Sequence, residues 1–305
     1  MEIWDTVIIG AGPAGLTSAI YAGRSQLKTL LMERLAPGGQ IAATELVENY
    51  PGFPEGIMGA DLAANMHEQA RKFGARIEHD EIQSVATAGA NIEVKGAAQT
   101  HMARTVILAM GTQPRMIDIP GEAEFFGRGV STCATCDAPL HRGHEVAVIG
   151  GGDSAIQESL FLARFCSKVH VIHRRDQLRA VPILGDKAKS TPNIEIHWDT
   201  IPLAILGEQG VDAIRLKNVK TDAESDLPVH GVFLFIGLLP NTDAVKGLDL
   251  ELDDKGFIVT DDRLATSVPG VFAAGDIRSK TQRQLATAVG DGAQSVFSVE
   301  RYLES

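Results

Sequence analysis

The 305-residue sequence predicts an α/β fold with two domains, the second inserted into the first. A glycine-rich turn occurs twice, at residues 10–15 and 150–155, each time between a short apolar run and a helical segment. The final part of the chain has no such turn, and the simplest account is that it completes the first domain. The pattern therefore predicts two Rossmann-like nucleotide-binding domains. We expect the first to comprise residues 1–115 and 244–305, and the inserted one residues 116–243.

The composition is that of a globular protein and argues against several classes of function. Hydrophobic residues make up 44% of the chain and charged residues 22%. The net charge of −11 disfavours a general nucleic-acid or anionic-membrane binder, because both need a basic face. No apolar run reaches the ~20 residues of a membrane span. The start lacks the features of a signal peptide, and 3 cysteines do not form a secreted disulfide framework, so we expect a cytoplasmic protein.

The first glycine turn has the features of a dinucleotide-binding unit. Residues 3–9 predict a buried strand, the glycine turn follows, and a second apolar run from Leu27 to Met32 ends at Glu33. Glycines allow the tight turn and a close approach of the ligand, and the start of the next helix attracts a pyrophosphate. A carboxylate at the end of the second strand binds a ribose hydroxyl. This site should therefore take a nucleotide such as FAD or NAD.

The second glycine turn repeats the pattern with one change of charge. Glu33 lies 23 residues after Gly10, and His173 lies 23 residues after Gly150, so the acid of the first site is replaced here. Arg174 and Arg175 follow directly, with Arg179 close behind. Guanidinium groups hold a 2′-phosphate that a carboxylate would repel. The second site is predicted to prefer NADPH, the alternative being an ordinary solvated basic end of a strand.

Other segments supply the remaining elements of both domains. The helix over 62–73 is amphipathic and ends at Gly74, and its apolar positions are core. A Gly/Pro/Asn cluster at 237–241 predicts a linker. The pattern further predicts β segments within 76–95, strands at 105–109, 145–149, 168–172, 193–197, 212–218, 232–236 and 271–274, and a last helix over 286–302.

Two cysteines lie between the glycine turns, at Cys133 and Cys136, with Asp137 directly after them. Thiols at this spacing can form and break one disulfide with little movement of the backbone, which suits thiol–disulfide exchange. A structural zinc site needs two further ligands at matching spacing, and only Cys166 remains, which we expect to be buried. Two unrelated buried thiols are the plain alternative. No metal is expected, because no ligand spacing links the acids or cysteines to the histidines 67, 79, 101, 141 and 144.

Seven short motifs in this order resemble one family along essentially the whole chain. They are GAGPAG, GGQ at 38–40, ENYPGF at 48–53, CATCD, GGGDSA, HRRDQLRA, and GVFAAGDIRSKTQRQ at 270–284. The sequence is similar to the low-molecular-weight, NADPH-dependent thioredoxin reductases, which are homodimeric flavoproteins. The resemblance implies FAD and NADPH as cofactors, thioredoxin as the protein substrate and a homodimer as the assembly.

The resemblance also implies roles for individual residues. Cys136 corresponds to the cysteine that faces the flavin, Cys133 to the one that attacks thioredoxin, and Asp137 to an acid that moves a proton during exchange. The implied FAD contacts are Gly10, Gly12, Pro13, Ala14, Gly15, Glu33, Gly38, Gly39, Gln40, Asn49, Gly275, Asp276, Arg283, Gln284, Leu285 and Ala286. The implied NADPH contacts are Gly150, Gly151, Gly152, Asp153, Ser154, Ala155, His173, Arg174, Arg175 and Arg179.

Plainer roles remain open for three of the acids and amides in these sets. Asp276 could be a turn acid or helix N-cap, Asn49 an Asx turn before Pro51, and Asp137 a surface turn residue. The sequence also departs from the family pattern after Asp137, where many members carry glycine and this chain has Ala138 and Pro139. A stiffer turn is expected there.

The order of the motifs has a mechanical consequence. The cysteine pair and the second glycine turn belong to the same inserted domain, yet both need contact with one flavin on the other domain. We therefore expect the inserted domain to rotate about strands near 115–118 and 241–245, as the resemblance also implies. Two other functions remain open: a related reductase that serves another dithiol carrier, and a nucleotide-binding redox sensor.

Overall fold

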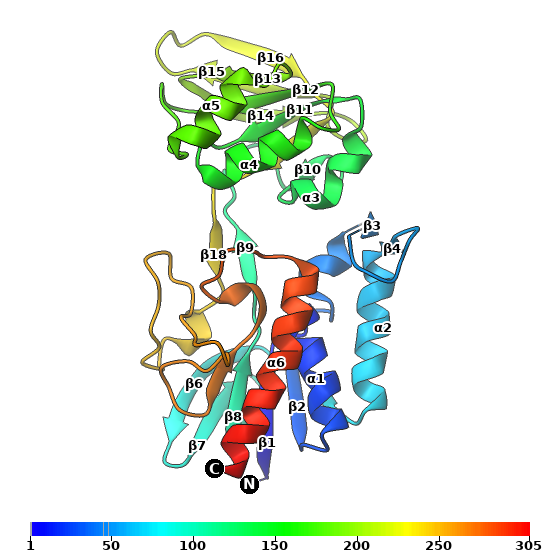
Figure 1. Cartoon of the computed structure of the whole chain (residues 1–305), viewed down its shortest axis with the longest axis vertical. Helices are drawn as coiled ribbons and strands as arrows, with labels where there is room; N and C mark the ends of the chain where they lie inside the picture. The colour runs from blue at the N-terminus through cyan, green and yellow to red at the C-terminus, as the bar shows by residue number, and fades with distance from the viewer. Residues whose placement is uncertain (1, 45, 48) are drawn as a thin grey trace. The chain divides into compact units, whose positions relative to one another are not determined.

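The computed structural model describes residues 2–44, 46–47 and 49–305 and divides into two compact units (Figure 1). Unit 1 comprises the chain up to Gln113 and from Leu239 onward, and unit 2 comprises Pro114–Leu238. Both units combine a mainly parallel sheet with helices, which agrees with the predicted α/β class. Among the described residues, no helix is both long and apolar enough to cross a membrane.

Unit 1 is built on a seven-stranded sheet whose central strands are buried on both faces. β1 pairs in parallel with β2 on one side and with β8 on the other, so that Val7 lies opposite Leu30 and Val106. Such strands read as continuous apolar runs because no face meets water. The strand order is β5 (Arg76–His79), β2 (Thr29–Glu33), β1 (Ile3–Ile9), β8 (Thr100–Leu108), β7 (Asn91–Gly96) and β6 (Ile82–Ala88), with β19 (Val271–Ala273) pairing to β8.

Three helices pack on one face of this sheet: α1 (Pro13–Arg24), α2 (Gly59–Lys72) and α6 (Leu285–Glu304). Figure 1 shows α1 and α6 side by side. Their contact is close because Gly292 faces the Ala14 carbonyl and leaves no room for a side chain. The Ser18 hydroxyl lies 3.1 Å from the Gly292 carbonyl oxygen and 3.1 Å from the Ser295 hydroxyl. The first half of α1 and the middle of α6 are thereby fixed to one another.

Unit 2 is built on a five-stranded parallel sheet with different layers on its two faces. Its strand order is β10 (Val130–Ser131), β17 (Gly231–Leu234), β11 (Glu145–Ile149), β12 (Lys168–Ile172) and β13 (Ile194–His197). One face packs against α3 (Ala134–Asp137), α4 (Asp153–Leu162) and α5 (Pro182–Ser190). The other face packs against an antiparallel sheet of β14 (Thr200–Leu206), β15 (Ala213–Asn218) and β16 (Glu224–Pro228).

Besides the short β10 and α3, the sequence pattern missed β14, β16 and α5, each for a local reason. β14 contains Pro202 next to a shift in register, and proline weakens any strand signal. β16 is a largely exposed edge strand without apolar alternation. α5 has only two buried residues, Gly185 and Ala188, so it lacks a strong apolar stripe.

Several short elements complete the chain. They include the strands β3 (Leu46–Val47) and β4 (Ile57–Met58) and the 3₁₀ helices η1 (Gly39–Ala43), η2 (Ala138–His141), η3 (Asp243–Val245) and η4 (Gly275–Ile277). Where the chain passes between the units, β9 (Thr112–Pro114) pairs with β18 (Leu238–Pro240). Both strands end at a proline, which cannot donate to a strand ladder, and both lie a few residues before the connecting strands expected from the sequence.

Candidate active site and nucleotide-binding turns

The first glycine turn joins β1 to α1 in a form that excludes side chains on its inner side. A Cβ on Gly15 would overlap the Gly10 carbonyl oxygen, and a Cβ on Gly10 would lie 2.6 Å from the Ala109 carbonyl oxygen. The outer side is open, since no described atom lies within 4 Å of a Cβ placed on Gly12. Gly12 also caps α1 without a side-chain hydrogen bond from the described residues. A helix start of this kind has unsatisfied N–H groups and room for a phosphate.

Glu33 lies where the sequence places the ribose-binding acid. Its Oε2 accepts a 2.7 Å hydrogen bond from the Ala11 amide, and its Oε1 accepts one of 2.9 Å from the Leu35 amide. The two bonds hold the carboxylate beside the glycine turn and leave lone pairs for a ribose hydroxyl. A pocket of about 370 Å³ adjoins it, lined by Glu33, Leu35, Pro37, His67, Arg71, Ala75, Ile77, Glu78 and His79. Its volume lies within the range of small-molecule binding pockets.

The predicted residues Gly38 and Gly39 lie against the same turn, whereas Gln40 and Asn49 contact other segments of unit 1. The Gly38 amide donates to the Ala11 carbonyl at 2.7 Å, and a Cβ on Gly39 would lie 3.1 Å from the Cα of Gly12. Gln40 donates from Nε2 to the Thr112 carbonyl at 2.7 Å. Asn49 donates from Nδ2 to Gln284 Oε1 at 3.3 Å, which joins two predicted positions 235 residues apart. Glu48, the first residue of the ENYPGF motif, lies outside the described residues.

Asp276 follows β19 and has a buried carboxylate oxygen that could accept a hydrogen bond from a ligand. Its Oδ1 is buried and has no hydrogen-bond partner among the described residues. Burial raises the pKa of Asp276, an effect that Lys280 and Arg283 oppose. The N-cap of η4 is Ala274, so Asp276 does not serve as that cap. A buried acceptor without a hydrogen bond is costly, and a hydroxyl of the flavin nucleotide would satisfy it.

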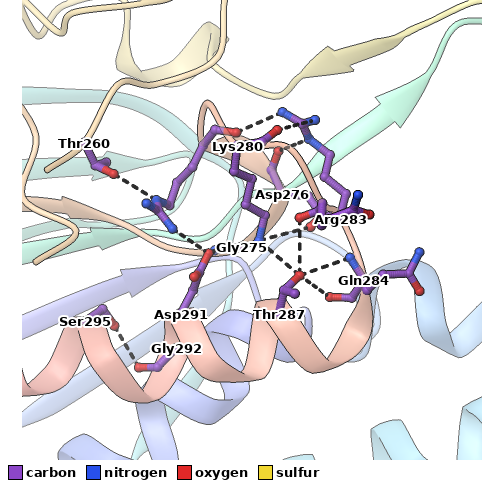
Figure 2. A network of polar contacts seen from close by, with 12 residues as sticks. Thr260, Gly275, Asp276, Lys280, Arg283, Gln284, Thr287, Asp291, Gly292 and Ser295 are labelled. Carbon is purple, nitrogen blue, oxygen red and sulfur yellow. Dashed lines mark hydrogen bonds and ion pairs between the residues drawn. The ribbon is translucent and has the colours of Figure 1, made fainter. Parts of the chain in front are cut away.

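A network of charges behind Asp276 was not predicted from the sequence (Figure 2). Asp291, on α6, accepts a 3.0 Å hydrogen bond from the Gly275 amide and another of 3.0 Å from Lys280 Nζ. The same oxygen lies 2.9 Å from Arg278 Nη1. Lys280 Nζ is in turn 3.7 Å from Asp276 Oδ1. Asp291 therefore fixes the Gly275–Asp276 turn to α6.

Arg283, predicted as a flavin contact, is used by the protein itself. Its guanidinium donates to the carbonyls of Asp276, Arg278 and Lys280 at 2.9–3.1 Å. Its Cζ also lies 3.9 Å from the ring centroid of Phe257, and burial lowers the pKa of the guanidinium. The arginine thus braces the loop that leads to Gln284, where α6 begins with a reciprocal cap between Gln284 and Thr287. Leu285 and Ala286 form the first turn of that helix.

The second glycine turn joins β11 to α4 in unit 2. A Cβ on Gly151 would overlap the His173 ring, and a Cβ on Gly150 would lie 2.8 Å from the Ala155 side chain. Gly152 caps α4 without a side-chain hydrogen bond from the described residues. The Arg179 amide donates to the Gly151 carbonyl at 2.7 Å, so the basic segment is tied to the turn. The uncapped helix start and the adjacent arginine fit a nucleotide phosphate.

The residues predicted for NADPH divide into two groups by exposure. His173 is 5% exposed, and its Nε2 donates to the Gln177 carbonyl at 2.8 Å. Burial lowers the pKa of His173, and the nearby arginines lower it further, so the ring is neutral and shapes the loop. Asp153 also shapes it, accepting a 2.8 Å bond from the Val181 amide. The exposed side chains are Asp153, Ser154, Arg174, Arg175 and Arg179, and of these Asp153 already accepts the bond from Val181.

Cys133 and Cys136 form a disulfide across the first turn of α3. The Cys133 amide donates to the Ser131 hydroxyl at 3.0 Å, and both cysteines are half-buried. Asp137, also half-buried, ends the helix directly after the pair. α3 packs against α4 through a shared core cluster that contains Ala134, Ala138, Ala155 and Ile156. A redox-active pair is therefore held in the same unit as the second glycine turn.

Ala138 and Pro139, which depart from the family pattern, and the third cysteine, Cys166, all fit the fold without strain in the neighbouring elements. Ala138 is buried, and Pro139 lies in the first turn of η2, where a helix needs no N–H from that residue. The chain thus continues from α3 into η2 without a glycine. Cys166 is buried, as expected, and burial raises the pKa of its thiol to about 11, which makes it unreactive.

Known proteins with similar sequences belong to a family of nucleotide-dependent disulfide oxidoreductases. Residues 4–292 match the family of pyridine nucleotide-disulphide oxidoreductases. The chain is 45% identical over 304 residues to the thioredoxin reductase of Bacillus subtilis, covering 99% of this chain and 96% of that protein. It is 44% identical over 302 residues to the thioredoxin reductase of Treponema pallidum, and the match covers 99% of this chain and 98% of that protein.

A solved structure shows the same relationship in three dimensions. The crystal structure of thioredoxin reductase from Streptococcus pyogenes matches with a TM-score of 0.93 and 43% identity, covering 99% of this chain and 98% of that one. The likeness spans both units and all seven motifs. The chain belongs to the thioredoxin reductase family of the pyridine nucleotide-disulphide oxidoreductases.

Proposed function

We propose that this protein is an NADPH-dependent flavoprotein that reduces the disulfide of thioredoxin. The observation that carries the proposal is the Cys133–Cys136 disulfide, held on a helix that packs against the helix of the second glycine turn. Bound FAD would accept a hydride from NADPH and supply two electrons to that disulfide. The two sulfurs then take two protons and become a dithiol, which is the form that can reduce a second disulfide.

The two cysteines have different tasks in the exchange. The Cys133 thiolate attacks one sulfur of the thioredoxin disulfide, and a mixed disulfide forms as the other sulfur leaves as a thiolate. Cys136 then attacks Cys133, which releases reduced thioredoxin and restores the Cys133–Cys136 bond. Each attack breaks one S–S bond and forms one, so the electrons balance. Asp137 lies directly after Cys136 and half-buried, which supports its role as the acid that moves the proton.

The two nucleotides are held by residues of different kinds. In unit 1 we assign the α1 start to the FAD pyrophosphate, Glu33 to the ribose, and Asp276 to a hydroxyl of the flavin arm. In unit 2 the exposed guanidiniums of Arg174, Arg175 and Arg179 are assigned to the 2′-phosphate of NADPH. His173, Asp153 and Arg283 act by shaping the loops, which their buried or backbone-directed hydrogen bonds support.

Further parts of the proposal concern arrangement rather than chemistry. The FAD domain comprises residues 1–115 and 244–305, and the NADPH domain residues 116–243. Rotation of the NADPH domain presents the dithiol and NADPH to the flavin in turn, which the presence of both in one unit supports. The enzyme is cytoplasmic, as expected for a dithiol system with so few cysteines, and it is a homodimer, as membership of the family implies.

The experiment is a steady-state assay of NADPH oxidation with and without oxidised thioredoxin. Turnover that depends on thioredoxin supports the proposal, whereas turnover only with another dithiol carrier or a small disulfide identifies the related reductase. In Cys136→Ser, thioredoxin reduction should disappear while NADPH still reduces an artificial acceptor such as ferricyanide, which needs no dithiol. Unchanged thioredoxin reduction in that variant would refute the electron route.

A further inference from the structure

An edge of the unit 2 sheet brings together two histidines and a carboxylate that the proposed function does not use. His170 lies on β12, and Glu195 and His197 lie on β13, with His170 opposite Glu195 in the parallel register. His170 Nδ1 is 3.0 Å from His197 Nε2, which is 3.6 Å from Glu195 Oε1. One donor atom from each of the three residues lies within 4.8 Å of the others. The three donors therefore converge on one point.

The spacing of these atoms is close to that of a tetrahedral zinc site. Zinc binds imidazole nitrogen at about 2.0–2.1 Å and carboxylate oxygen at a similar distance, which places neighbouring ligand atoms about 3.3 Å apart. The separations of His197 Nε2 from His170 Nδ1 and Glu195 Oε1, 3.0 and 3.6 Å, lie on either side of that value, and every pair of donors lies within 4.8 Å. Small side-chain shifts would complete the geometry, with water as the fourth ligand. Two histidines and one glutamate form a ligand set that zinc uses in proteins.

A second carboxylate supports the histidine that is least able to move. His170 is 2% exposed, and its Nε2 lies 2.8 Å from Glu145 Oε2 on β11. A proton on Nε2, donated to that carboxylate, leaves Nδ1 with its lone pair directed at His197. Metal-binding histidines are oriented in this way by a carboxylate behind the ring. Glu195 is also paired with Lys168, so the metal would compete with an ammonium for that carboxylate.

We propose that His170, His197 and Glu195 form a binding site for one Zn²⁺ ion, with Glu145 orienting His170. The site joins β13 to β12, the strand that leads into the basic NADPH segment, and the His173 amide at the start of that segment donates to the His197 carbonyl at 3.0 Å. Zinc here would brace that strand pair. Without a metal, the same residues form a hydrogen-bonded chain from Glu145 through His170 to His197, and the experiment must separate the two states.

The test is a calorimetric titration of the chelator-treated, full-length protein with Zn²⁺. The Cys133–Cys136 disulfide is kept oxidised, because free thiolates would bind zinc themselves. We expect one Zn²⁺ per chain, a higher unfolding temperature in its presence, and two imidazole nitrogens at about 2.0–2.1 Å by X-ray absorption. Glu145→Gln should weaken binding by about 10–100-fold, as loss of an orienting carboxylate does. His197→Gln should remove the binding and the thermal shift together.

Glu224→Gln, which alters an exposed carboxylate on β16 of the same unit, is the matched control and should bind zinc like the parent. If His197→Gln does not fold, Glu195→Gln takes its place, because that side chain is 48% exposed and its loss leaves the core intact. Absence of stoichiometric binding in the parent would overturn the proposal. So would binding that the His197 and Glu195 variants retain in full, since the zinc would then be adventitious at the surface.

Discussion

Asp291→Asn tests whether the charge network behind Asp276 holds the flavin site together. One oxygen of Asp291 lies within 3.0 Å of the Gly275 amide, Arg278 and Lys280. The side chains of Arg278 and Lys280 are only 13% and 12% exposed. Asparagine keeps the shape and one acceptor for the Gly275 amide, but it removes the negative charge between two half-buried cations.

The expected cost follows from that geometry. Removing one partner of a buried ion pair costs about 3–5 kcal/mol, and the asparagine oxygen recovers part of this through the hydrogen bonds it keeps. We therefore expect the free energy of unfolding of unit 1 to fall by about 2–3 kcal/mol. Lys280 would also pair more strongly with Asp276, 3.7 Å away, and compete with a flavin hydroxyl for that carboxylate. Weaker FAD binding should accompany the loss of stability.

Two measurements check this, and each has a clear refuting result. Chemical denaturation followed by flavin fluorescence and by circular dichroism gives the unfolding free energy, and equilibrium dialysis gives FAD retention. Asp254→Asn, an exposed loop carboxylate in unit 1, is the control and should match the parent. If Asp291→Asn loses less than about 0.5 kcal/mol and keeps its FAD, the network does not position the site and the reasoning is wrong.

Three further predictions concern both nucleotide sites and acid stability. Arg174→Ala with Arg175→Ala should raise the KM for NADPH about tenfold or more, through loss of charge-assisted bonds, and leave the KM for NADH nearly unchanged in the same kinetic assay. Gly15→Ala should not yield FAD-loaded protein, because its Cβ would overlap the Gly10 carbonyl, and the absorbance spectrum of the purified protein reports this. Burial, and to a smaller extent the charges of His144 and His230, lower the pKa of His141 from 6.5 to about 4. Between pH 6.5 and 4 the unfolded chain therefore binds more protons than the folded one, and the free energy of unfolding falls as the pH is lowered. His141→Phe, which keeps the ring against Phe233, should flatten the decline in unfolding free energy measured between pH 6.5 and 4.

The sequence predicts best those features that depend on neighbours in the chain. The glycine turns, the flanking strands and the Cys133–Cys136 pair are local patterns, and the structure has each of them where the spacing places it. Contacts between segments that are distant in the chain produce no such pattern in the sequence. Asp291 lies 16 residues beyond Gly275 on a helix whose pattern reports only its apolar face, and His197 lies 27 residues after His170 on another strand. Sequence spacing cannot find ligands that only strand pairing brings together.

A family motif marks where a nucleotide binds, but it does not separate the residues that touch the ligand from those that shape the turn. His173 and the arginines after it form one basic run in the sequence, yet the ring is buried beneath Gly151 while Arg174 and Arg175 reach solvent. The physical reason is the place of each residue at the end of β12: the first position after the strand still faces the core, and the next ones leave it. The same division appears in unit 1, where Arg283 donates to the chain's own carbonyls and Asp276 keeps a buried oxygen without a hydrogen bond. The residues with unsatisfied or exposed polar groups are therefore those to which ligand contacts should be assigned, because the others have already used their hydrogen bonds in holding the site.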